Sequence, residues 1–305
     1  QLKTINAATS GAIVLDVPGG ALTGDAADIV LALAGSITTH TGTVTIDDDG
    51  TTDVNATDIT TINTKATGTI VVSNAIDING SGSEVKAAFD AINTNTGNAT
   101  ANITGTDYTV AQLKAINAKT TGAIVMATPT AALEGSVADL KLAFTGSVTT
   151  HTGTVTISDD ATDDITATDI TTINTAATGN ITATNAIDLN GSGSEVAAAV
   201  TAINTHSGAT TANITGTDYT AAHLKTINDG ISGAIVLVDP SANLSGSASD
   251  VAAAFAGTVT THTGNITLTS NHDLAELKAI NNASNGTITL NSYAVDLSGS
   301  TSDVK

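Results

Sequence analysis

The most regular feature of the chain is an alternation of apolar and polar residues that follows a glycine. In GTVTI, for example, Val44 and Ile46 point to one side and threonines to the other. A period of two predicts a short β-strand. After a turn and a second short apolar segment, apolar residues recur at three-residue steps, as at Val110, Leu113 and Ile116. This spacing predicts the buried face of a helix, so each unit is predicted to run strand, short strand, helix.

The unit recurs along the whole chain of 305 residues. Eleven glycines mark it, and their spacings are 31, 26, 29 and 25, then the same four again, then 31 and 22, so four units make one super-repeat with an offset of 111. The segment ITGTDYTVAQLKAINAKTTGAIV, which begins at Ile103, returns from Ile214 with 16 of 23 positions identical. Self-similarity at this period is typical of a solenoid. The marker glycines are Gly11, Gly42, Gly68, Gly97, Gly122, Gly153, Gly179, Gly208, Gly233, Gly264 and Gly286.

These periods predict an α/β or β-rich solenoid of about eleven stacked coils of roughly 28 residues, whose strands form a parallel sheet. We expect one continuous array over residues 1–305, with super-repeats at about 1–111, 112–222 and 223–305, the last one partial, and no capping repeats. Strands pair about 4.8 Å apart, whereas packed helices need about 8 to 10 Å. A curved or loosely helical stack is therefore favoured over a straight one.

Short motifs predict where the helices begin and end. S-x-x-[DE] is the signature of a capping box at a helix start. Ile-Asn before a threonine-rich turn predicts a helix end, where the asparagine caps the helix or hydrogen-bonds the turn. The predicted boxes are Ser81–Glu84, Ser136–Asp139, Ser192–Glu195, Ser247–Asp250 and Ser300–Asp303, and the predicted terminators are Asn6, Asn63, Asn117, Asn174, Asn228 and Asn281.

The chain opens and closes inside the same kind of element. Joining its ends places Val304 and Lys305 before Gln1 and Leu2 and restores one helix in register with the segment that contains Gln112. We therefore expect the array to continue, either within a longer chain or by head-to-tail self-association of copies, in which Val304 and Lys305 meet Gln1 and Leu2. An open parallel edge is a template for such pairing.

The amino-acid composition argues against several classes of binding partner. The net charge is −20, all nine basic residues are Lys, and Cys is absent. Nucleic acid would be repelled, the arginine clamp for phosphate is missing, and disulfides and thiolate chemistry are excluded. No apolar run is long enough to span a membrane. Acidity combined with many Thr, Asn and Ser residues favours an extracellular or cell-surface location.

Catalytic chemistry is not indicated, and we expect no enzyme activity. His40, His151 and His262 recur every four coils, too far apart to share a metal, and are predicted to be surface residues of turns. Threonine pairs such as Thr43 and Thr45 lie on one face of a strand and suggest an ice-binding surface, which needs threonine at this place in every strand (rung) of the sheet. Other rungs carry Ala and Val at the equivalent positions, for example Ala123 and Val125, which argues against ice binding. These Ala/Val rungs, being apolar on both faces, are expected to be buried on both, against a helix or a neighbouring fibre.

Two acidic loops, IDDDGTTDVNATD and SDDATDDITATD, occupy equivalent places in the first two super-repeats. Clustered Asp carboxylates and backbone carbonyls suit Ca²⁺, although the EF-hand spacing is absent. Solvated turns are the alternative, in which case no cofactor is needed. The candidate ligands are Asp47, Asp48, Asp49, Asp159, Asp160, Asp163 and Asp164.

The segments GSxSDVAAAFAGT and LKAINxxTxGAIVL, with their long near-identical repeats, resemble the tandem-repeat surface proteins of bacteria, especially the very long ones of marine cyanobacteria. The resemblance covers the entire chain. It implies secretion, an extended array and a structural or adhesive role, and it carries over no catalytic residue.

We therefore expect a structural segment of an extracellular filament, sheath or surface fibre. Its partners would be further copies of itself, neighbouring fibres or cell-surface components. The alternative is a calcium-rigidified adhesin stalk, which differs by a large calcium-dependent gain in melting temperature.

Overall fold

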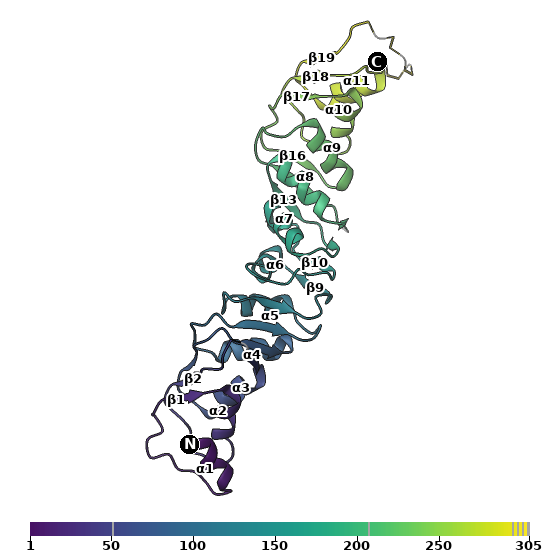
Figure 1. The fold of residues 1–305 in the computed structure, drawn as a ribbon. Coiled ribbons are helices and arrows are strands. Elements are labelled where there is room, and N and C mark those ends of the chain that lie inside the picture. Colours follow the sequence, from purple (N-terminus) through teal and green to yellow (C-terminus); the bar gives the residue numbers. More distant parts are fainter. Residues whose placement is uncertain (51, 207, 295, 298, 301, 304–305) are drawn as a thin grey trace. The chain divides into compact units, whose positions relative to one another are not determined.

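A computed structural model describes residues 1–305 except 51, 207, 295, 298, 301, 304 and 305. The chain divides into two compact units, Gln1–Leu133 with Asp139–Gly153, and Glu134–Ala138 with Thr154–Lys305. In both, short parallel strands alternate with helices in coils of strand, short strand and helix (Figure 1). The predicted α/β repeat solenoid is thereby confirmed. That all coils form one continuous array stays a prediction.

The first unit contains two parallel sheets, each with one strand per coil. Their orders are β1-β2-β4-β6 and β3-β5-β7-β8. The helices of consecutive coils pack against one another in chain order. The strands are β1 (Leu22–Gly24), β2 (Val44–Ile46), β3 (Asp53–Asn55), β4 (Ile70–Val72), β5 (Asp77–Gly80), β6 (Thr94–Asn95), β7 (Thr100–Ile103) and β8 (Ile124–Met126); the helices are α1 (Leu2–Ala8), α2 (Ala26–Ala32), α3 (Ala56–Lys65), α4 (Gly82–Ala91) and α5 (Val110–Asn117).

The second unit repeats this scheme. β10, β12 and β14 pair in parallel, as do β11-β13-β15-β16 and β17-β18-β19. The strands are β10 (Val155–Ile157), β11 (Asp164–Thr166), β12 (Ile181–Ala183), β13 (Asp188–Gly191), β14 (Thr205–His206), β15 (Thr211–Ile214), β16 (Ile235–Leu237), β17 (Leu244–Gly246), β18 (Ile266–Leu268) and β19 (Ile288–Thr289); the helices are α7 (Ala167–Ala176), α8 (Gly193–Ala202), α9 (Ala221–Gly230), α10 (Ala248–Ala254) and α11 (Leu274–Ala283). The division between the units falls within β9 (Leu133–Gly135) and α6 (Val137–Ala143).

The core of each unit is a stack of equivalent aliphatic side chains. Val44 pairs in register with Ile70, and both are fully buried. Leu113 and Ile116, on the predicted helix face, are also fully buried. Because each coil contributes mainly Ile, Val, Leu and Ala, neighbouring coils fit with only a few buried aromatic residues, such as Phe89.

Nine marker glycines, Gly42 and those that follow it except Gly179, lie where the backbones of neighbouring coils approach closely. A Cβ at Gly68 would lie 1.8 Å from the carbonyl oxygen of Gly42, and one at Gly286 would lie 1.8 Å from that of Gly264. No real Cβ tolerates such a distance from backbone. The glycine period therefore records contact between coils, beyond its role as a mark of strand starts.

Two of the predicted capping boxes are complete: the Ser81 and Ser192 side chains accept from the amides of Glu84 and Glu195, whose carboxylates accept in return. The terminator asparagines act differently from the prediction. Asn6 Nδ2 donates to the carbonyl of Leu31, at 2.6 Å, which belongs to the helix of the next coil. Asn117 and Asn228 donate in the same way to Leu142 and Ala253, so these side chains bind the end of the following helix.

The expected burial of the Ala/Val rungs against a helix is wrong, whereas their contact with a neighbouring fibre stays a prediction. Val14, Val125 and Val236 are 82%, 40% and 37% exposed, so the outer face of these rungs is open in each unit. Val125 and Val236 also belong to different sheets from the threonine rungs. Within its own sheet, Thr156 pairs with Thr182, and Thr182 with Thr205, which makes a continuous threonine column on the outer face.

Candidate functional sites

Each acidic loop contains one buried carboxylate that accepts a hydrogen bond from the helix of the preceding coil. Asp48 Oδ2 accepts a hydrogen bond of 2.7 Å from the amide of Ala26, the first residue of α2. Asp159 does the same for Val137, the first residue of α6, also at 2.7 Å. Burial raises the pKa of both carboxyl groups, and these backbone hydrogen bonds offset part of the effect.

The other candidate calcium ligands are held within the loops or against neighbouring strands. Thr162 donates to Asp160 from both its amide and its hydroxyl, which lowers the pKa of Asp160. The Asp163 carboxylate accepts a hydrogen bond from the backbone amide of Asp160 at 3.2 Å, and the Asp164 carboxylate accepts one from the side-chain amide of Asn190 at 3.4 Å. Asp49 accepts from the Thr52 hydroxyl at 2.9 Å, and the Asp47 carbonyl accepts from the Asn74 side chain at 2.9 Å. Each loop is thus organised by hydrogen bonds within itself and to the next coil.

These carboxylates do not converge. Over the described residues, no group of three or more His, Asp or Glu side chains stands close enough together to hold a metal ion. Asp48 and Asp159 face the helix of the preceding coil, whereas Asp160 and Asp163 are bound to their own turn. Calcium binding at these loops stays a prediction, for which a titration is the test.

The recurring histidines are buried, contrary to the prediction of surface turns. His151 and His262 are fully buried, and His40 is 5% exposed. The missed signal is the recurrence of tyrosine and phenylalanine at the period of the super-repeat: Tyr108 and Tyr219 return with the histidines. The tyrosine is distant in sequence from its histidine, so the contact emerges only from the stacking of coils.

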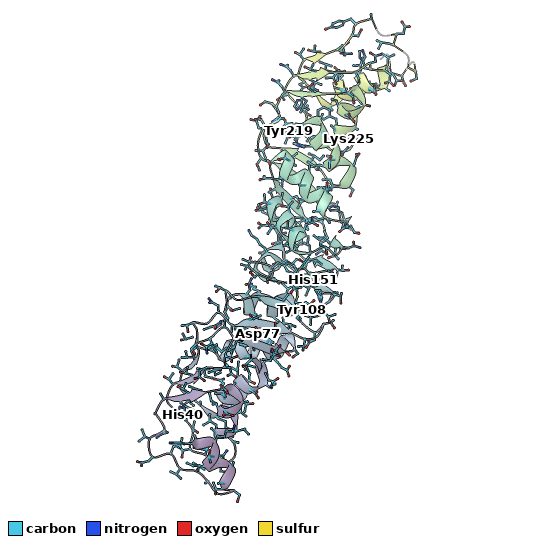
Figure 2. The ribbon with its side chains drawn as sticks, viewed as in Figure 1. His40, Asp77, Tyr108, His151, Tyr219 and Lys225 are labelled. Atoms are coloured by element: carbon cyan, nitrogen blue, oxygen red, sulfur yellow. The ribbon has the colours of Figure 1, made fainter. Side chains whose placement is uncertain are left out.

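His151 and His262 each lie between two aromatic rings. The His151 ring centroid lies 6.3 Å from that of Tyr108, edge to face, and 5.8 Å from that of Phe144. The His262 ring lies 6.1 Å from Tyr219 and 5.6 Å from Phe255. Figure 2 labels Tyr108 and His151 in the first unit and Tyr219 in the second. We call these two groups the Tyr-His-Phe clusters.

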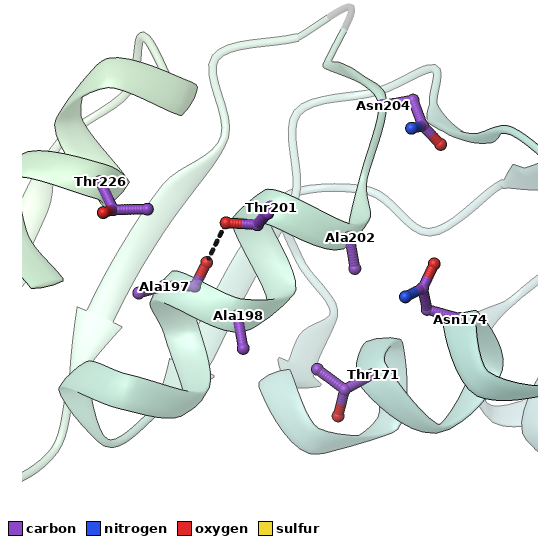
Figure 3. Close-up of a pocket in the computed structure, with 8 residues that line it drawn as sticks. All are labelled: Thr171, Asn174, Ala197, Ala198, Thr201, Ala202, Asn204 and Thr226. Atoms are coloured by element: carbon purple, nitrogen blue, oxygen red, sulfur yellow. Dashed lines mark hydrogen bonds between the residues drawn. The ribbon is translucent and has the colours of Figure 1, made fainter.

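A shallow groove crosses α7, α8 and α9 in the second unit (Figure 3). Its volume is about 460 Å³, and small residues line it; the Thr201 hydroxyl donates to the carbonyl of Ala197 at its wall. At the positions of Ala197 and Thr201, α4 in the first unit carries the ion pair of Lys86 and Asp90, at 2.6 Å. The groove is lined by Thr171, Asn174, Ala197, Ala198, Thr201, Ala202, Asn204 and Thr226, a set without a charged or nucleophilic pair.

The face of α1 is open. Ile5 occupies the position of Ile116 in α5 and of Ile227 in α9, yet it is 53% exposed while both equivalents are fully buried. Gly11 shows the same difference, because a Cβ there would meet nothing closer than the Thr9 hydroxyl, at 3.4 Å. The predicted meeting of Val304 and Lys305 with Gln1 and Leu2 involves residues 304 and 305, which lie outside the described residues.

Comparison with known proteins gives no relative: no protein-family model matches the chain, and no curated protein matches its sequence. None of the helices in the described part of the chain is long and apolar enough to cross a membrane. The interpretation of function therefore depends on the contacts between coils.

Proposed function

We propose that this chain is a structural protein: a segment of an extracellular filament, sheath or surface fibre that grows by adding coils of the same kind head to tail. The observation that carries the proposal is the repetition of the same contacts between coils, such as the full burial of Ile116 and Ile227 at equivalent positions. Ile5 is half exposed at a position that internal coils bury completely. A further coil packed on α1 would bury it in the same way.

The contacts between internal coils show what such a joint would use. Lys3 and Lys114 each form an ion pair with an aspartate on the next helix, Asp28 and Asp139 respectively. Exposed pairs of this kind add little stability, but they favour one register between helices. Burial of equivalent isoleucines supplies the free energy, at about 25 cal/mol per Å² of apolar surface. The ion pair recurs at Lys3 and Lys114, one super-repeat apart, and burial of the equivalent isoleucine recurs at Ile116 and Ile227, so a joint between copies needs no new chemistry.

Acidity and composition support the location that we propose. Over all residues the net charge is −20, which keeps neighbouring stacks apart at low salt and allows closer approach when salt screens them. The chain contains no cysteine that oxidation could damage. Both properties suit a fibre outside the cell.

The test is the association state of the purified chain, measured by sedimentation velocity and by electron microscopy of concentrated samples. We expect association that increases with concentration, and fibres. The variant Ile5→Asp should abolish association because it places a charge in the joint. Thr4→Asp adds the same charge beside it, at an exposed position, and should leave association much less affected.

Two outcomes would overturn the proposal. One is a monomer at every concentration, with no fibres. The other is equal association of the Ile5→Asp and Thr4→Asp variants, which would mean that the face of α1 is not the joint. Circular dichroism on each variant checks that the coils remain folded.

A further inference from the structure

The Tyr-His-Phe clusters carry an inference that is independent of the proposed function. His262 is fully buried, and its Nε2 atom lacks a hydrogen-bond partner in the described structure. Its Nδ1 atom lies 3.4 Å from the Tyr219 hydroxyl, which donates to the carbonyl of Asp239 at 3.0 Å. The imidazole is therefore buried with one nitrogen that has no hydrogen-bond partner, an arrangement that disfavours a positive charge on the ring.

His262 is packed against two aromatic rings and backbone. Tyr219 faces it ahead of α9, and Phe255 faces it from the end of α10. The next coil contributes backbone near Ser284. Asp239, whose carbonyl accepts from Tyr219, has a carboxylate that is bound instead to the amide and hydroxyl of Ser241. Burial accordingly lowers the pKa of His262, and a backbone hydrogen bond at Ala242 offsets only part of this effect.

We propose that the Tyr-His-Phe cluster of the second unit is an acid-sensitive lock between coils, which holds them closed at neutral pH and opens when His262 is protonated. Each cluster joins three chain segments: in the second unit Tyr219 precedes α9, Phe255 ends α10, and His262 bridges to the strand region of the next coil. A proton on the ring must either stay buried without a counter-ion or move the ring into water. The second course separates the coils.

The direction of the pH effect follows from the difference in proton binding between the closed and the opened chain. A histidine that is buried as the neutral form has a lower pKa in the folded state than its ordinary value of about 6.5. Between the two values the unfolded or opened chain binds more protons, so opening becomes more favourable as the pH falls. Each such histidine then increases the opening equilibrium by up to about tenfold per pH unit within that window. Above the window the lock is closed.

Hydrogen exchange followed by mass spectrometry tests this in the full chain, between pH 7.5 and 5, after correction for the intrinsic pH dependence of exchange. We expect the opening of peptides from β16 to β18 to increase steeply below about pH 6.5. The variant His262→Phe keeps a ring in the cluster and removes the proton site, and it should flatten that dependence. His223→Gln is the matched control, since α5 carries Gln112 at the equivalent position, and it should keep the wild-type dependence.

Equal pH dependence in the wild type and in His262→Phe would overturn the proposal, because the other carboxylates and histidines would then account for acid opening. If His262→Phe does not fold, an NMR titration of the wild-type imidazole gives the answer. A midpoint below the ordinary histidine value supports the lock, and a midpoint at or above that value refutes it.

Discussion

Replacement of Gly68 by alanine should separate two neighbouring coils of the first unit. The added Cβ would lie 1.8 Å from the carbonyl oxygen of Gly42 and 2.5 Å from its carbonyl carbon. Both atoms belong to backbone, so no side chain is able to rotate away. A Cβ essentially never lies within 3.0 Å of another heavy atom, so the coils must move apart at this point.

The cost follows from what that movement disturbs. Val44 donates to the carbonyl of Thr69 at 2.8 Å, and Thr67 donates to the carbonyl of His40 at 2.8 Å, on the two sides of Gly68. Backbone hydrogen bonds each contribute about 0.5 to 1.5 kcal/mol net, and overpacking typically costs about 1 to 3 kcal/mol. We therefore expect Gly68→Ala to lower the free energy of unfolding by about 3 kcal/mol or more.

Urea denaturation followed by circular dichroism measures this change, with Gly20→Ala as the matched control. A Cβ at Gly20 meets nothing closer than the carbonyl oxygen of Val17, at 3.6 Å, which is ordinary contact. We expect that control to stay within about 0.5 kcal/mol of the wild type, as surface substitutions usually do. Similar losses for both variants would refute the reasoning, because the effect would then come from glycine flexibility in general.

Two further predictions concern polar contacts. Asp48→Ala leaves the first amide of α2 buried without its acceptor and should cost about 1 to 3 kcal/mol of stability. Asp48→Ser should cost less, because in the third super-repeat the Ser270 hydroxyl accepts the hydrogen bond from the equivalent amide, that of Ala248. Urea denaturation of both variants measures the difference. The Ser192 amide lowers the pKa of Glu195, so this carboxylate stabilises the fold at neutral pH, and its contribution disappears as the pH falls through the lowered pKa. Glu195→Gln, which copies Gln112 in α5, should reduce the loss of melting temperature between pH 6 and 3, and an unchanged loss would contradict this assignment.

The parts of the fold that local sequence determines were predictable. The capping boxes at Ser81 and Ser192 are confirmed because all their atoms lie within one short stretch of chain. The strand, short strand and helix of each coil follow from periodicity for the same reason. The helix ends were less accurate: α3 continues past Asn63 to Lys65. Asparagines at this place, such as Asn117, bind the next coil rather than closing their own helix.

What sequence reasoning missed depends on which coils touch. His262 and Tyr219 are 43 residues apart in the sequence and meet only because successive coils stack on one another. The same holds for Asp48, which reaches 22 residues back to the start of α2. Treating the acidic loops as isolated clusters suggested a metal site, whereas stacking gives one carboxylate of each loop a structural partner.

The contacts that join coils act almost entirely between nearest neighbours. The Asn6 and Asp48 contacts span 22 to 28 residues, about one coil of chain, and the Lys114 contact lies within that range. Stability in such an array is approximately a sum over coils and the interfaces between them. Adding a coil therefore repeats existing contacts without altering earlier ones, which makes length free to vary. A protein whose length is free while its cross-section is fixed suits a spacer or fibre, and this is why we favour a structural function over a site-based one.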